Sequence, residues 1–175
     1  DSSYPVAFLE YSFRNDTASR QDAVFYYAAM NFLDTGCGQA SVSKYKTGFL
    51  LRQSGMQEAP WEKCDYCALI DDSAARVNTA LFRGGWFDSL TMLWNDIQAG
   101  KSEEKQREQQ KDFPNPGGCL SLEFSLMPGE EKTIPVICCW YVPESSLRIA
   151  RAEDDGAEEE IPLWKKERYS PWYAG

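Results

Sequence analysis

The feature that most constrains the fold is an alternation of apolar and polar residues along residues 119–126. Leucine or phenylalanine occupies the even positions from 120 to 126, and serine or glutamate occupies the odd positions between them. A period of two is typical of a β-strand that buries one face. The string Met127-Pro128-Gly129-Glu130 follows and indicates a type II turn, because proline restricts φ and glycine accepts the positive φ that comes next. This pattern predicts a β-hairpin whose second strand covers residues 132–142.

The predicted second strand is apolar on both faces. Positions 134, 136, 138 and 140 form one face with Ile, Val, Cys and Trp, and positions 137, 139 and 141 form the other with Ile, Cys and Tyr. A strand of this kind is expected inside a sandwich, where both faces are covered. Pro135 has no backbone N–H, so we expect a sheet edge or a bulge at that point.

Further strand patterns cover residues 6–13, 22–32, 47–52, 67–70 and 77–82, with turn-prone residues between them. A helical period appears in residues 86–97, where apolar residues recur at spacings of three and four. We therefore predict a mainly β fold, an antiparallel β-sandwich with one short helix near residues 86–98. The sandwich is expected to span residues 1–152 and to be incomplete at its N-terminus. Residues 153–175 are expected to form an acidic loop and a linker.

Charge and composition exclude several classes of function. The 175-residue chain has 27 acidic residues, 18 basic residues and no histidine, for a net charge of −9. A surface of this sign repels nucleic-acid phosphates, so no nucleic-acid partner is expected. Without histidine the chain has no Ser-His-Asp triad and no histidine metal site. Six acidic residues fall in residues 153–160 and lack the spacing of a calcium loop. No transmembrane segment and no signal peptide are indicated.

The six cysteines leave three alternatives open. Cys64 and Cys67 form a CxxC pair, which is half of a zinc site or a redox pair, and the six cysteines could also form three disulfides. Cys138 and Cys139 are adjacent in a predicted strand and must point to opposite faces, so they cannot both bind one tetrahedral metal. We expect free thiols, no metal and no cofactor, which slightly favours a cytoplasmic location.

Three other stretches contain residue types that could have a functional role. Asp88 and Asp96 lie beside tryptophans on the predicted helix, but nothing else converges on them, and a role in helix capping is favoured over catalysis. Asn15-Asp16-Thr17 satisfies the N-glycosylation pattern, which is frequent by chance. Residues 101–112 are balanced in charge and almost without apolar side chains, so a mobile loop is favoured over a solvated helical turn.

Five strings carry a resemblance to a known family, namely FLEYSFRN at residues 8–15, FRGGWFDSLT at residues 82–91, LMPGEEKTI at residues 126–134, WYVP at residues 140–143 and YSPWYAG at residues 169–175. Together they resemble the N-terminal domain of glycoside hydrolase family 116, the family of bacterial and archaeal β-glucosidases and of the animal non-lysosomal glucosylceramidase. The resemblance implies a β-sandwich packed against an (α/α)6 barrel. It also implies that a retaining mechanism, with a Glu nucleophile and an Asp acid/base, lies in that barrel. No position here matches those motifs, so no catalytic residue is assigned to this chain.

The resemblance implies that this chain is a non-catalytic domain of a glycoside hydrolase. Its expected partners are the catalytic barrel of the same chain and, for the parent enzyme, a glucoside or glucosylceramide-type substrate. Large aromatic residues favour contact with the barrel over contact with sugar. The candidates are Trp86, Trp94, Trp164, Trp172 and Tyr173. Two alternatives remain, a free-standing carbohydrate-binding or adhesion module and a zinc-stabilised interaction domain.

Overall fold

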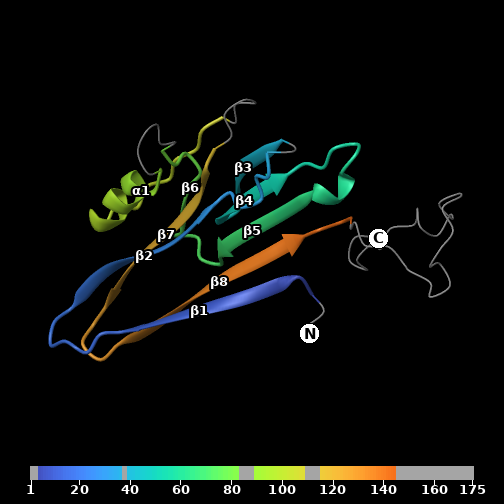
Figure 1. Cartoon of the computed structure of the whole chain (residues 1–175). Helices are drawn as coiled ribbons and strands as arrows, with labels where there is room; N and C mark the ends of the chain where they lie inside the picture. The colour runs from blue at the N-terminus through green and yellow to red at the C-terminus, as the bar shows by residue number, and fades with distance from the viewer. Residues whose placement is uncertain (1–3, 37–38, 83–88, 109–114, 145–175) are drawn as a thin grey trace, which may run out of the picture.

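The computed structural model describes residues 4–36, 39–82, 89–108 and 115–144, which form two antiparallel β-sheets and one α-helix. Sheet A has the strand order β1-β8-β5-β4-β3, and sheet B has the order β2-β7-β6 (Figure 1). The strands are β1 (Val6–Arg14), β2 (Gln21–Met30), β3 (Ala40–Tyr45), β4 (Gly48–Gln53), β5 (Cys64–Ile70), β6 (Arg76–Asn78), β7 (Gly117–Leu126) and β8 (Glu131–Tyr141). The helix is α1 (Ser89–Gln98), and a short 3-10 helix covers Pro60–Glu62.

The core lies between the two sheets. Sheet A contributes Phe49, Leu51 and Val136, which are fully buried, and sheet B contributes Leu120 and Leu122 to the same cluster. The even residues of β7 face this core, as the alternation along residues 119–126 predicts. The prediction of a mainly β, antiparallel sandwich with one short helix is confirmed.

The predicted hairpin is wrong, although its turn is right. Glu130 N–H donates to the carbonyl of Met127, and Gly129 has a φ of 77°, as a type II turn requires. However, β7 pairs with β2 and β6, whereas β8 pairs with β1 and β5. The turn therefore carries the chain from one sheet to the other at a corner of the sandwich. A turn motif defines local backbone geometry and does not specify which strands pair on either side of it.

Pro135 has no backbone N–H, and it lies at a position where the sheet needs no hydrogen bond from that group. The pairing of β5 with β8 ends at Ile70 opposite Val136, so at Pro135 the strand β8 is paired only with β1. Within β8 the backbone N–H and C=O groups of the even-numbered residues point to β1. Two hydrogen bonds at the ends of the pairing show this, because Trp140 N–H donates to the carbonyl of Pro5 and Asn15 N–H donates to the carbonyl of Glu130. The backbone of Pro135 therefore faces the open side. This confirms the prediction of a sheet edge at this residue.

Three segments differ from the sequence-based predictions. Strand β3 was not predicted, because its alternating residues are mostly Ala, Ser and Lys and give a weak apolar signal. The strand predicted over residues 77–82 ends at Asn78 as β6, and Thr79 N–H then donates to the carbonyl of Lys105. Residues 101–108 were expected to belong to a mobile loop, but contacts to β3, β6 and β7 hold them. Examples are the Lys44–Glu104 ion pair and the hydrogen bond between the Ser102 and Ser121 hydroxyls.

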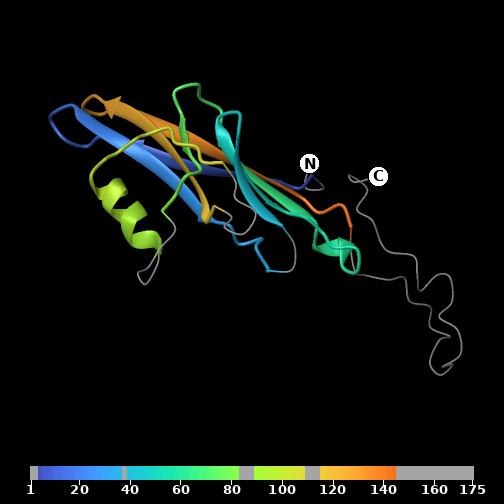
Figure 2. The same ribbon diagram turned by 90° about the horizontal axis from the view of Figure 1, so that it is seen from above.

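The two sheets have unequal outer faces. Helix α1 lies against sheet B on the side away from sheet A (Figures 1 and 2). Leu93 and Ile97 of the helix lie with Tyr26, Cys119 and Ser121 of sheet B around one small cavity. Neither view shows a described element on the outer face of sheet A. The described residues thus stack as helix, sheet B and sheet A, with the outer side of sheet A left open.

Asn15 ties together the two turns at which the chain changes sheet. Its backbone N–H donates to Glu130 and its carbonyl accepts from Gly129, across the two turns. The side-chain Nδ2 donates to the carbonyls of Ser19 and Leu126, at 2.8 and 2.9 Å. Asn15 is only 3% exposed. Both Nδ2 hydrogens are used inside the fold, so in the folded chain this nitrogen is not free to carry a glycan.

Replacing this amide should destabilise the sandwich. Asn15→Ala leaves two carbonyls without their donor at a corner that both sheets share, and we expect a loss of about 2–4 kcal/mol in the free energy of unfolding. The matched control is Asp16→Ala, which removes an exposed carboxylate paired only with exposed Arg14 and should cost less than about 0.5 kcal/mol. Urea unfolding followed by circular dichroism measures both. Equal losses would show that Asn15 is not a structural tie.

Candidate interaction surface

The outer face of sheet A is apolar across its two central cross-strand rows. Directly paired residues of an antiparallel sheet point to the same side, so the strand register identifies which side chains share this face. The first row consists of Phe8, Ile137, Leu69, Gly48 and Tyr45. The second row consists of Val6, Cys139, Cys67, Leu50 and Ser43. Neither row carries a charged residue, whereas a sheet face exposed to water is normally polar.

Most of these side chains are accessible to solvent. Phe8 is 63% exposed, and Leu50, Leu69 and Ile137 are half-buried. A shallow hollow of about 400 Å³ lies over the face and is lined mainly by apolar atoms. At its border Arg52 donates two hydrogen bonds to the carboxylate of Asp65, which raises the pKa of the guanidinium. An apolar centre bordered by a paired charge is typical of an interaction surface.

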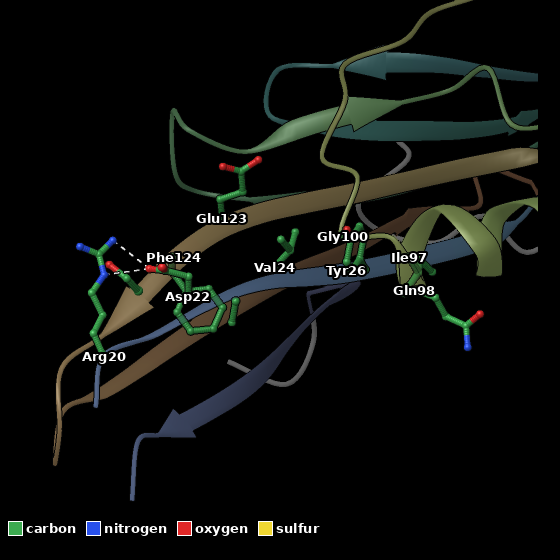
Figure 3. Close-up of a pocket in the computed structure, with 11 residues that line it drawn as sticks. Arg20, Asp22, Val24, Tyr26, Ile97, Gln98, Gly100, Glu123 and Phe124 are labelled. Atoms are coloured by element: carbon green, nitrogen blue, oxygen red, sulfur yellow. Dashed lines mark hydrogen bonds and ion pairs between the residues drawn. The ribbon is translucent and has the colours of Figure 1, made fainter. Parts of the chain in front are cut away.

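The outer face of sheet B has a different character. Its β7 positions carry Ser121, Glu123 and Ser125, and α1 covers one end of it. A hollow of about 710 Å³ remains between α1 and the strands β2 and β7 (Figure 3). Three of the polar side chains in it have partners, since Arg20 forms an ion pair with Asp22 and the Tyr26 hydroxyl donates to the carbonyl of Lys101.

Of the five aromatic residues predicted for an interface, Trp94 is the one that the structure describes. It is 57% exposed on α1, near the exposed side chains of Leu90 and Met92. It lies on the helix that covers sheet B and not on the apolar face of sheet A. Four of the predicted residues lie outside the described residues, namely Trp86, Trp164, Trp172 and Tyr173.

The carboxylates of the helix do not form a catalytic pair among the described residues. Asp96 Oδ1 accepts a hydrogen bond from the ammonium group of Lys101 at 2.6 Å. Asp88 lies outside the described residues, as does the acidic stretch 153–160. The one described carboxylate of α1 is therefore already paired with a cation.

Four of the five described cysteines lie in sheet A, on both of its faces, and Cys119 lies on β7 of sheet B. Cys64 and Cys67 point to opposite sides of β5, because their spacing in a strand is odd, so the CxxC pair does not form two ligands of one metal. Cys138 faces the core, where the Tyr66 hydroxyl donates to its sulfur at 3.2 Å. Cys139 faces outward, so Cys138 and Cys139 point to opposite faces of the sheet, as predicted. All five described cysteines are free thiols, and these residues contain no cluster of three or more metal-binding side chains.

Comparison with protein families indicates the kind of protein to which this domain belongs. Residues 1–175 match the family model described as beta-glucosidase 2, glycosyl-hydrolase family 116 N-term. The chain belongs to this family. A comparison with individual curated proteins finds no match. Membership of this N-terminal family implies a catalytic domain in the parent glycoside hydrolase. Among the described residues no helix is long and apolar enough to cross a membrane.

The interaction surface itself was not predicted from the sequence. The signal was present, because residues 134–141 are apolar on both faces, but both faces were assigned to the interior of one sandwich. The structure buries the face with Ile134, Val136 and Cys138 and leaves the face with Ile137 and Cys139 half-exposed.

Leu50 and Leu51 are adjacent in β4 and point to opposite faces of sheet A, so substitutions at these two residues test the interaction surface and the core separately. Leu51 is fully buried in the core, and Leu51→Ala should lower the free energy of unfolding by about 2–5 kcal/mol. Leu50 points outward and is half-buried, so Leu50→Ala should cost less than about 1 kcal/mol in residues 1–175 alone. Urea unfolding of both variants tests this difference. A large loss for Leu50→Ala would mean that its face is already part of this chain's own core.

Proposed function

We propose that this domain is a non-catalytic scaffold of a retaining β-glucosidase or glucosylceramidase-like enzyme, and that the outer face of sheet A docks onto the catalytic barrel. The observation that carries the proposal is the pair of uncharged cross-strand rows on that face. Covering them with an apolar partner removes exposed hydrophobic surface from water, which is the main driving force of domain association.

The chemistry of the parent enzyme is assigned to the barrel in this proposal. A retaining glycosidase uses two carboxyl groups about 5–5.5 Å apart, one as nucleophile and one as acid/base. Among the described carboxylates, Asp96 is paired with Lys101 and Asp22 is paired with Arg20. The domain's contribution is to support the barrel, and glucosides or glucosylceramide-type lipids are the proposed substrates of the whole enzyme.

A charge placed on the outer face of sheet A should uncouple the two domains. In the parent enzyme Phe8→Lys would put an ammonium group into the buried contact, and we expect the equilibrium for docking to fall at least tenfold, which corresponds to about 1.4 kcal/mol. In residues 1–175 alone the same change should be nearly neutral, because Phe8 is 63% exposed. Differential scanning calorimetry of the parent enzyme should show one cooperative transition in the wild type and two in the variant.

The matched control is Trp94→Lys. Trp94 is 57% exposed on α1, so it compares with Phe8 in size class and accessibility but lies beside sheet B. We expect the single transition to persist in this variant. If Trp94→Lys splits the transition and Phe8→Lys does not, the barrel docks on the helix side and the assignment to sheet A is wrong.

A further inference from the structure

Two cysteines face each other at the centre of the outer face of sheet A. Cys67 on β5 and Cys139 on β8 are direct partners in the antiparallel register, so their side chains project to the same side. Both are half-buried free thiols and both line the shallow hollow over this face. A small reagent in solvent can therefore reach both sulfurs when the face is uncovered.

The backbone at this pair has a defined spacing. Even-numbered residues of β8 bond to β1, so the N–H and C=O of Cys139 point to β5, which makes Cys67 and Cys139 a hydrogen-bonded pair. The Cα atoms of such a pair are about 5.5 Å apart, within the range that a disulfide spans. The Cβ atoms of such a pair are farther apart than an unstrained disulfide prefers, so the bond would be strained and readily reduced.

We propose that Cys67 and Cys139 form a redox-active dithiol that closes reversibly to a cross-strand disulfide at the centre of the docking face. The oxidant is a small-molecule disulfide of the glutathione class. The thiolate of one cysteine attacks the small disulfide, forms a mixed disulfide and releases one small thiolate. The thiolate of the second cysteine then attacks the protein sulfur of that mixed disulfide and releases the second small thiol. Two protein thiols lose two electrons and two protons, and one small disulfide gains them.

The surroundings of the pair make this reaction slow at neutral pH and faster in base. Burial, with Cys139 nearby, raises the pKa of Cys67 to about 11, and burial also raises the pKa of Cys139. Other charged groups around the hollow are Lys46, which favours the Cys67 thiolate, and the Arg52–Asp65 ion pair. Because only the thiolate attacks, the rate of closure should rise about tenfold per pH unit between pH 7 and 9.

The test is oxidation of residues 1–175 with oxidised glutathione, followed by tryptic digestion without reductant and mass spectrometry. Trypsin leaves Cys64 with Cys67 on one peptide and Cys138 with Cys139 on another. We expect these two peptides to become linked, and dithiothreitol to separate them. Near-UV circular dichroism reports whether the chain is folded, and the same reaction in urea measures chance pairing.

Single variants identify the linked sulfurs. Cys67→Ser and Cys139→Ser should abolish the link, whereas Cys64→Ser and Cys138→Ser should retain it, because these two residues lie on the inner side of the sheet. If residues 1–175 show no native near-UV signal, the parent enzyme refolded in the glutathione buffer is used instead, since the face is open before docking. No link above the urea level in folded protein, or a link that survives Cys139→Ser, overturns the proposal.

The folded parent enzyme separates this proposal from the proposed docking. If both hold, the pair links in residues 1–175 and is protected in the parent enzyme. If Cys67 and Cys139 link at equal rates in residues 1–175 and in the parent enzyme, the dithiol proposal stands and the proposed docking on sheet A is refuted. Absence of the link in folded residues 1–175 would refute the dithiol, whatever the parent enzyme does.

Discussion

The structure depends on a core that two sheets share, and the chain passes between those sheets twice at one corner. The turn after β1 and the turn after β7 both lie at this corner, and Asn15 bonds them to each other. This connection places β1 beside β8 and β2 beside β7, so the four longest strands pair in two sheets over one apolar layer. This packing buries the inner faces of both sheets. The outer faces therefore form the surface of the domain.

The outer faces of the two sheets differ in polarity and in how far other elements cover them. On sheet B the outward positions of β7 include Ser121, Glu123 and Ser125 and α1 covers part of the surface, whereas on sheet A ten paired positions carry no charge and no described element covers them. Exposed apolar surface of this kind favours association. Membership of the glycosyl-hydrolase family 116 N-terminal family implies a catalytic domain in the parent protein, and that domain is the partner proposed for this face. The proposed scaffold role follows from these two observations together.

The sequence patterns predicted most of the strands and the single helix, because the period of two in β1 and β7 and the period near four in α1 are local signals. They could not predict that β7 and β8 belong to different sheets, since pairing is a non-local choice made by the whole core. The same limit applies to the interaction surface. Ile137 and Ile134 have the same apolar side chain, and only the packing of sheet B against one of their two faces makes one residue core and the other surface.

The most direct test of the docking surface is hydroxyl-radical footprinting of the parent enzyme against residues 1–175 alone, read for each side chain by mass spectrometry. The account predicts that oxidation of Phe8, Leu69 and Ile137 falls strongly in the parent enzyme, while that of Leu90 and Trp94 on α1 changes little. Unchanged oxidation of Phe8, Leu69 and Ile137, together with protection of Trp94, would contradict docking through sheet A.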